Sequence, residues 1–117
     1  MPDYEPHVEF PVYRATYMMM VSIFGFVKHF TKEYNYSVGE SLKKETMELM
    51  TLIFRANALR DKAEVLQEAR ERIEVIRLYL RLMMDLHQVS LKQFVRVNQK
   101  VEQVWRQLTG WHKSVRA

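Results

Sequence analysis

The sequence predicts an all-helical protein of one domain, folded as an antiparallel up-and-down four-helix bundle. All three prolines lie before Tyr13, so about a hundred residues follow without this helix breaker. Apolar residues make up 48% of the 117-residue chain and charged residues 27%, a balance typical of a chain that folds around its own core. Apolar side chains recur at helical spacing in four stretches, and short connections between such stretches favour an antiparallel bundle.

The first twelve residues predict an extended arm, and the first helix is expected over 13–30. This helix carries two apolar stripes. One contains Tyr17, Met20, Val21, Phe24 and Val27, and the other contains Met19, Ile23, Phe26 and Phe30. A bundle core covers only one face of a helix, so a second stripe indicates self-association. We assign that role to the candidate oligomer-interface residues Met19, Ile23, Phe26 and Phe30.

The second helix is expected over 38–57. Ser37 and Glu40 have the spacing of a capping box, in which each side chain accepts a hydrogen bond from a backbone amide at the helix start. The inward stripe of this helix is Leu42, Leu49, Ile53 and Ala56. A break near 57–60 precedes the third helix, expected over 61–87, with Asp61 placed to cap it.

The third helix carries a heptad-like apolar series of Leu66, Ala69, Ile73, Ile76, Leu80 and Met83. The fourth helix is expected over 90–109. Ser90 and Gln93 form a second capping box there, with Val89 and Phe94 as a hydrophobic staple. Its predicted inner face is Leu91, Phe94, Val101, Trp105 and Leu108. Gly110 is expected to end this helix, so that the bundle spans 13–113 and residues 114–117 form a tail.

The sequence lacks the motifs of a metal, cofactor or catalytic site. There is no cysteine, which excludes disulfides and thiolate metal ligands. No histidine follows a glutamate at the spacing used by metal-binding bundles, and no Gly-rich phosphate loop is present. We therefore expect no metal, no cofactor and no enzymatic activity. With no signal peptide and no apolar run of roughly 18 to 20 residues, a cytoplasmic protein with no membrane partner is expected.

The positive charge is concentrated near the end of the chain. The formal net charge is +4, yet residues 87–117 contain six lysines and arginines against Glu102 alone. Lys92, Arg96 and Lys100 recur every four residues and form a stripe on the fourth helix that contains no acid. This stripe is either an ordinary solvated face or a surface that neutralises nucleic-acid phosphates.

Arg77 and Arg81 lie one turn apart in an otherwise apolar stretch of the third helix. Two interpretations stay open for them. Acids at helical spacing, Glu74 and Asp85, could pair with these guanidinium groups along one helix face. Alternatively, the two groups bind phosphate or a partner's carboxylate, for which the planar fork of arginine is suited.

Two segments carry a family resemblance. FTKEYNYSVGESL at 30–42 and IFRAN at 53–57, together with Arg77 and Arg81, resemble a four-helix-bundle family. This family includes ribosomal-RNA intervening-sequence proteins and the accessory variability determinant (Avd-like) proteins of diversity-generating retroelements. The resemblance covers about 13–113.

The resemblance implies a homopentameric barrel of four-helix bundles with a basic surface. It also implies a non-catalytic protein that acts with a reverse transcriptase and its template RNA. The alternative within the same family is a protein of the intervening-sequence type, with a structural role and no nucleic-acid binding.

Overall fold

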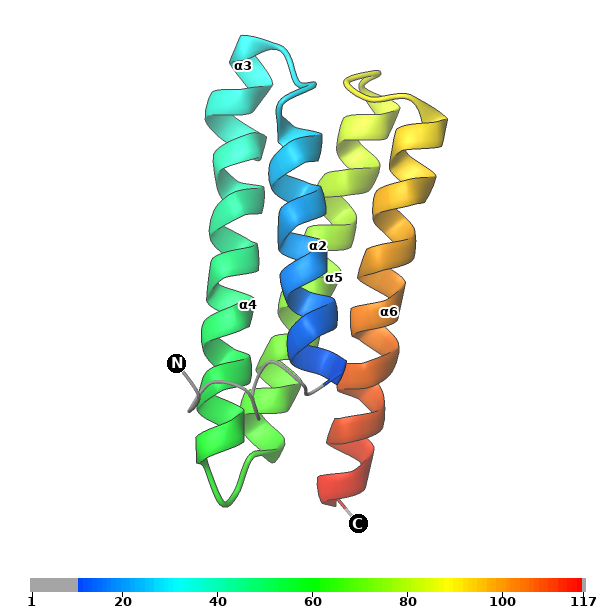
Figure 1. Cartoon of the computed structure of the whole chain (residues 1–117). Coiled ribbons are helices and arrows are strands. Elements are labelled where there is room, and N and C mark those ends of the chain that lie inside the picture. The colour runs from blue at the N-terminus through cyan, green and yellow to red at the C-terminus, as the bar shows by residue number, and fades with distance from the viewer. Residues whose placement is uncertain (1–10, 117) are drawn as a thin grey trace.

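The structure, a computed structural model, describes residues 11–116, which form four long helices and no strand (Figure 1). The helices are α2 (Pro11–Val27), α4 (Glu40–Ala58), α5 (Ala63–Asp85) and α6 (Leu91–Arg116). A short helix, α3 (Lys32–Tyr34), and a π-helical turn, η2 (Asn35–Gly39), lead directly into α4. The predicted arm lies outside the described residues except for its last two, which already belong to α2. Proline suits the first turn of a helix because no amide hydrogen is needed there.

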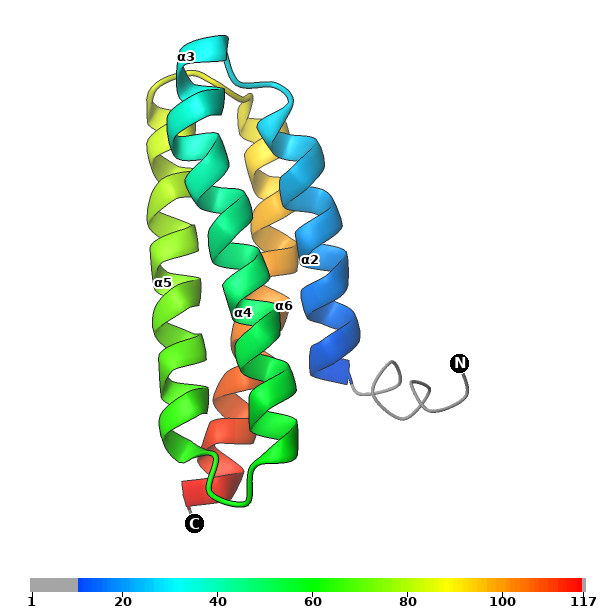
Figure 2. The same ribbon diagram turned by 90° about the vertical axis from the view of Figure 1, so that its left-hand side faces the viewer.

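The four long helices pack as an antiparallel bundle, which confirms the predicted fold. The α2–α4 and α5–α6 connections lie at one end, and the α4–α5 connection lies at the other end with the end of α6 (Figures 1 and 2). Each helix therefore runs opposite to the next one in the chain. α2 packs beside α4 and α6, and α5 packs beside the same two helices, so α2 and α5 are diagonal partners.

The core is one apolar cluster to which all four helices contribute. The heptad-like series of α5 is buried throughout, as predicted. α4 contributes its predicted stripe, and α6 contributes chiefly Val97, Val101, Val104 and Leu108. Leu91, at the first position of α6, was predicted to face inward, but it is 67% exposed.

The stripe predicted to form the oligomer interface lies instead in this core. Met19 and Ile23 have no exposed surface, and Phe26 and Phe30 keep only 4% and 6%. The two phenyl rings meet edge to face, with centroids 5.6 Å apart. The assignment of these four residues to an oligomer interface is therefore wrong. The other stripe is the more exposed one, and its members Tyr17, Val21 and Phe24 lie on the surface.

The capping box predicted at Ser37 is also absent. The helix begins at Lys32, and the Ser37 hydroxyl donates back to the Glu33 carbonyl at 3.1 Å, as a serine inside a helix does. The π-helical turn η2, between α3 and α4, passes close to α2. A methyl group added at Gly39 would lie 2.8 Å from Val27 Cγ1. Glycine is therefore required for this close approach.

The second capping box is confirmed. The Ser90 amide donates to Gln93 Oε1 at 2.9 Å, and the Gln93 amide donates to the Ser90 hydroxyl at 3.1 Å. Val89 is buried and Phe94 packs against the same core, in keeping with the predicted staple. The predicted end of α6 is wrong, because the helix passes through Gly110 and takes in Ser114–Arg116, which were expected to be tail.

α5 ends two residues before the predicted boundary, at Asp85. His87 has a left-handed backbone (φ 58°), and the amides of His87 and Gln88 donate to the carbonyls of Met84 and Met83. This is the Schellman arrangement, which usually places glycine at the left-handed position. Histidine gives no sequence signal for it. The Gln88 side chain also accepts from the Thr31 amide at 2.8 Å, which ties the two connections at this end together.

Candidate nucleic-acid and partner interface

Arg77 joins α5 to α6. Its Nε and Nη2 donate to Glu102 Oε2 of α6 at 2.9 and 2.6 Å, and its Nη1 donates to Glu74. The guanidinium carbon also stands 4.5 Å from the centroid of the Trp105 ring, while that of Arg70 stands 4.8 Å from the same ring. Trp105 thus interacts with two cations. Arg77 already has the anionic partner that its sequence context required, and this partner belongs to the same chain.

Arg81 differs from Arg77 in both exposure and pairing. Its side chain is 66% exposed, and Nε pairs with Asp85 of the same helix at 3.3 Å. A pair of this kind is weak in water and can exchange for another anion. Arg77 pairs with Glu74 and Arg81 pairs with Asp85, as the salt-bridged interpretation predicted, and Arg81 stays the more accessible of the two.

An ion-pair network also connects α4 to α5. Arg72 of α5 lies 3.0 Å from Glu45 and 2.8 Å from Glu48 of α4. The hydrogen bond to Glu45 raises the pKa of Arg72, and the charges of Glu45 and Glu48 act in the same direction. The acids of α4 and α5 are thus used to offset arginines of the same two helices.

The cations predicted on α6 lie on the side of the helix away from Glu102. Lys92 and Arg96 are exposed, and Lys100 is half-buried. None of these three forms an ion pair with another described residue. Two of them line hollows between α6 and α2. Lys100 shares a hollow of about 410 Å³ with Arg14, and Arg96 shares one of about 260 Å³ with His29.

These four side chains define a basic groove between α2 and α6: Arg14, His29, Arg96 and Lys100. Its polar lining is completed by glutamines of α6, including Gln107, whose buried Oε1 has no hydrogen-bond partner among the described groups. α2 contains no acid, and the single acid of α6 is bound to Arg77 on the other side of the helix. The groove is therefore lined by positive charge with no described acid beside it.

Sequence reasoning found the α6 half of this groove and missed the α2 half. Arg14 lies in the first turn of the apolar helix α2 and His29 in the turn that follows its end at Val27, and nothing in their local spacing connects them with Lys100 and Arg96. The connection is made by the antiparallel packing of α2 on α6. Arg14 did give one usable signal, because it is the sole charged residue of α2.

Residues 12–115 match the bAvd-like family. The chain belongs to the bAvd-like family. The match takes in all four helices, both arginines of α5 and the whole basic groove. No curated protein matches the chain.

Two further properties of this bAvd-like chain bear on its site. None of its described helices is both long and apolar enough to cross a membrane. Within residues 11–116, no cluster of three or more histidines and acids is placed to hold a metal ion.

Proposed function

We propose that this bAvd-like chain is a non-catalytic accessory protein that assembles with copies of itself and binds RNA through the basic groove between α2 and α6. The observation that carries the proposal is the unpaired positive charge of the groove, together with its lack of a described acid. Such a surface binds phosphates by releasing their counterions and needs no contact with bases. We further propose a homopentamer and a reverse transcriptase as protein partner, because the family resemblance implies both.

The pattern of ion pairs favours the groove over the α5 arginines as the RNA contact. Arg77 would have to give up Glu102, Glu74 and its place beside Trp105 before it could reach a phosphate. Arg14, Arg96 and Lys100 break no described ion pair when they bind an anion. The groove also offers cations on two helices rather than one, so a phosphate chain can lie between them.

A matched pair of charge variants tests the RNA contact. The groove variant replaces Arg14, Arg96 and Lys100 with alanine, and the control variant replaces three exposed cations outside the groove, Lys44, Arg55 and Arg60. Both lose three positive charges, so a nonspecific effect of net charge is the same in both. We expect the groove variant to bind a fluorescent single-stranded RNA at least ten-fold more weakly than the control does. Equal affinities in fluorescence anisotropy would contradict the proposed contact.

The reverse-transcriptase partner requires a separate measurement. A reverse transcriptase encoded beside this gene is titrated with the protein after nuclease treatment, so that shared RNA cannot bridge them. A complex seen by light scattering supports the accessory role, and a failure to bind removes this partner while leaving the RNA contact to its own test.

The internal pairing of Arg77 favours one alternative function. It removes a predicted cation from the surface, as expected for a structural bundle of the intervening-sequence type that binds no nucleic acid. Absence of RNA binding at low salt, with an intact oligomer, is the result that this alternative predicts. Position of the gene within a ribosomal-RNA locus supports it independently.

A further inference from the structure

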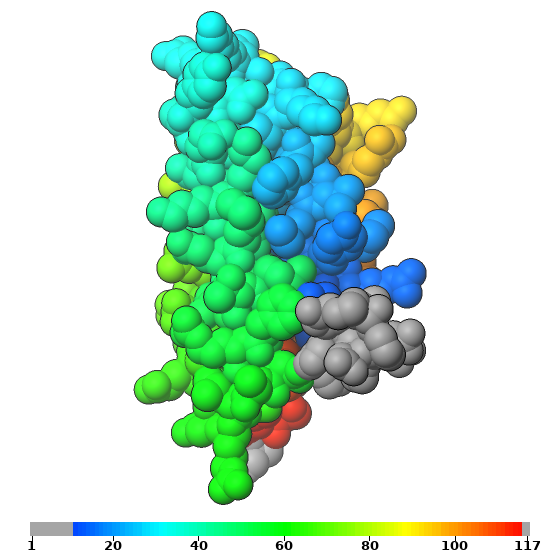
Figure 3. Space-filling view, turned by 60° about the vertical axis from the view of Figure 1, so that its left-hand side comes forward, coloured from blue at the N-terminus to red at the C-terminus, as the bar shows by residue number. Residues whose placement is uncertain are grey.

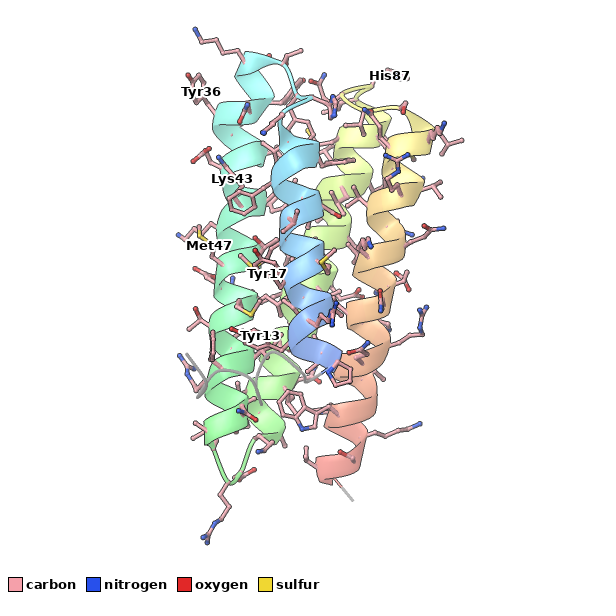
Figure 4. The ribbon with its side chains drawn as sticks, in the orientation of Figure 1. Tyr13, Tyr17, Tyr36, Lys43, Met47 and His87 are labelled. Atoms are coloured by element: carbon pink, nitrogen blue, oxygen red, sulfur yellow. The ribbon has the colours of Figure 1, made fainter. Side chains whose placement is uncertain are left out.

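An apolar face extends along α2 and α4 on the outside of the bundle. We define it by five exposed side chains, Tyr17, Val21 and Phe24 of α2 and Met47 and Phe54 of α4. Figure 4 shows Tyr13, Tyr17 and Lys43 at the seam between the two helices and Met47 at the outer edge of α4, and Figure 3 shows α4 and α2 in a space-filling view. A hollow of about 660 Å³ lies at the α2 side of the seam.

This face is large enough to form an interface. Its five side chains are 38% to 57% exposed. Large side chains present about 150 to 250 Å² each, so these fractions amount to roughly 500 Å² of apolar surface. The half-buried Tyr13, Met20 and Met50 extend it towards the ~800 Å² that one partner contributes to a stable interface.

The same chain carries a second apolar surface. Leu78 and Leu82 of α5 and Leu86, just after its last residue, are spaced four residues apart and form a leucine ridge, with exposures of 66%, 39% and 40%. The charged neighbours of the two surfaces differ in sign. Beside the apolar face stand Lys28, Lys43, Lys44 and Glu40, and beside the ridge stand Glu71, Glu74, Arg81 and Asp85.

The two surfaces also lie at the same height along the bundle. Arg77 is hydrogen-bonded to Glu102, so these two residues lie at the same height along the bundle. Because α5 and α6 are antiparallel, Leu82, five residues after Arg77, lies at the height of Val97, five residues before Glu102. Val97 in turn lines a hollow with Gly25 and Phe26 of α2. Leu82 is therefore level with Phe24, and a second copy placed beside the first without a vertical shift would bring these two side chains together.

The directions of the two surfaces favour a closed assembly. Arg72 of α5 faces α4, and at 100° per residue Leu82 and Leu78 point roughly 80° and 120° from it, on the side away from the buried series of α5. The ridge thus lies around the α4 edge of the bundle from the apolar face, rather than on the opposite side. When the two contacting surfaces lie on neighbouring sides of the bundle, each head-to-tail contact rotates one copy relative to the copy before it. Such a rotation is needed for the copies to close into a ring.

We propose that the apolar face of one copy packs on the leucine ridge of the next, with Phe24 against Leu82. This inference rests on the proposed self-assembly and assigns the surfaces that produce it. A two-fold contact of the apolar face with itself would leave the leucine ridge in water, whereas the head-to-tail contact covers both surfaces. It also leaves Arg14, Arg96 and Lys100 outside the contact, so the basic grooves of successive copies remain available to one RNA.

Cysteine cross-linking tests the pairing directly, because the chain has no cysteine of its own. Phe24→Cys and Leu82→Cys proteins, one of them tagged, are co-expressed and treated with a short bismaleimide. We expect a mixed cross-linked dimer, and little cross-linking in either protein alone. Gln99→Cys, exposed on α6, is the control partner for each. Cross-linking of Phe24→Cys with itself would show a two-fold contact and overturn the proposal.

A mass measurement with matched substitutions provides the second test. Leu78→Glu places a charge on the ridge, and Leu91→Glu places one at an equally exposed leucine outside it, at 66% and 67% exposure. We expect light scattering to show that Leu78→Glu lowers the oligomer to monomers while Leu91→Glu does not, with circular dichroism unchanged in both. An unchanged mass for Leu78→Glu would overturn the pairing alone. A monomeric wild-type protein would overturn self-assembly as well, and RNA binding by that monomer would leave the basic groove standing.

Discussion

At the scale of single residues, Arg77 and Arg81 illustrate how much one helical turn changes the environment of a cation. Arg77 is held by two carboxylates and the Trp105 ring, whereas Arg81 has one loose pair within its own helix. The sequence predicted Glu74 and Asp85 as partners of the two arginines, and both pairs form, but it did not predict Glu102. Glu102 is 25 positions away, and only the packing of α5 on α6 makes it a neighbour of Arg77.

This difference gives a prediction for stability. Arg77→Ala is expected to lower the free energy of unfolding by about 1 to 2 kcal/mol, because Glu102 loses a bidentate partner and Trp105 loses a cation. Arg81→Ala is expected to cost less than about 0.5 kcal/mol, as an exposed pair does. Urea unfolding followed by circular dichroism measures both. Equal losses for the two variants would contradict the structural role assigned to Arg77.

At the scale of helices, the two serine motifs show when a local signal determines the structure. Ser37 and Ser90 each stand three residues before a glutamate or glutamine. Ser90 follows a left-handed turn at His87 that interrupts the helix, so its hydroxyl meets a free amide. Ser37 lies inside a chain that is already helical from Lys32, where no amide is free. The motif alone does not indicate whether a helix has begun upstream.

The same two residues give a matched stability test. Ser90→Ala is expected to destabilise the protein by about 1 kcal/mol through loss of the cap of α6. Ser37→Ala removes only a bond back to a helical carbonyl and should change the stability by less than about 0.5 kcal/mol. Thermal melts of both variants provide the comparison. A larger loss for Ser37→Ala than for Ser90→Ala would be incompatible with these helix starts.

For α2, the sequence did not predict correctly which side of the helix faces the core. Both of its apolar stripes were recognised, but the more exposed one was assigned to the core and the buried one to the surface. The two stripes are adjacent on the helix and equally apolar, so the choice depends on where α4 and α6 stand around α2. α5 was easier, because charged residues occupy the faces beside its heptad-like series and leave one inward direction.

At the scale of the whole molecule, charge is divided between two halves of the bundle. The acids of α4 and α5 offset the arginines and lysines of those helices, whereas α2 and α6 carry seven lysines and arginines against Glu102 alone. Glu102 itself faces α5 through Arg77. The basic groove and the apolar face are therefore different surfaces, so the proposed RNA contact and the proposed contact with a second copy do not compete for the same residues.

An RNA contact through the basic groove makes the affinity for RNA depend on salt concentration. Single-stranded RNA affinity is measured by anisotropy over a range of salt concentrations for the wild type, the groove variant and the control variant. Each phosphate contact contributes about 0.7 to the slope of log affinity against log salt. Because the groove variant lacks three cations, we expect its slope to be smaller by about 2, and we expect the slope of the control to be unchanged. Equal slopes in all three proteins, or no binding of the wild type at low salt, would contradict it.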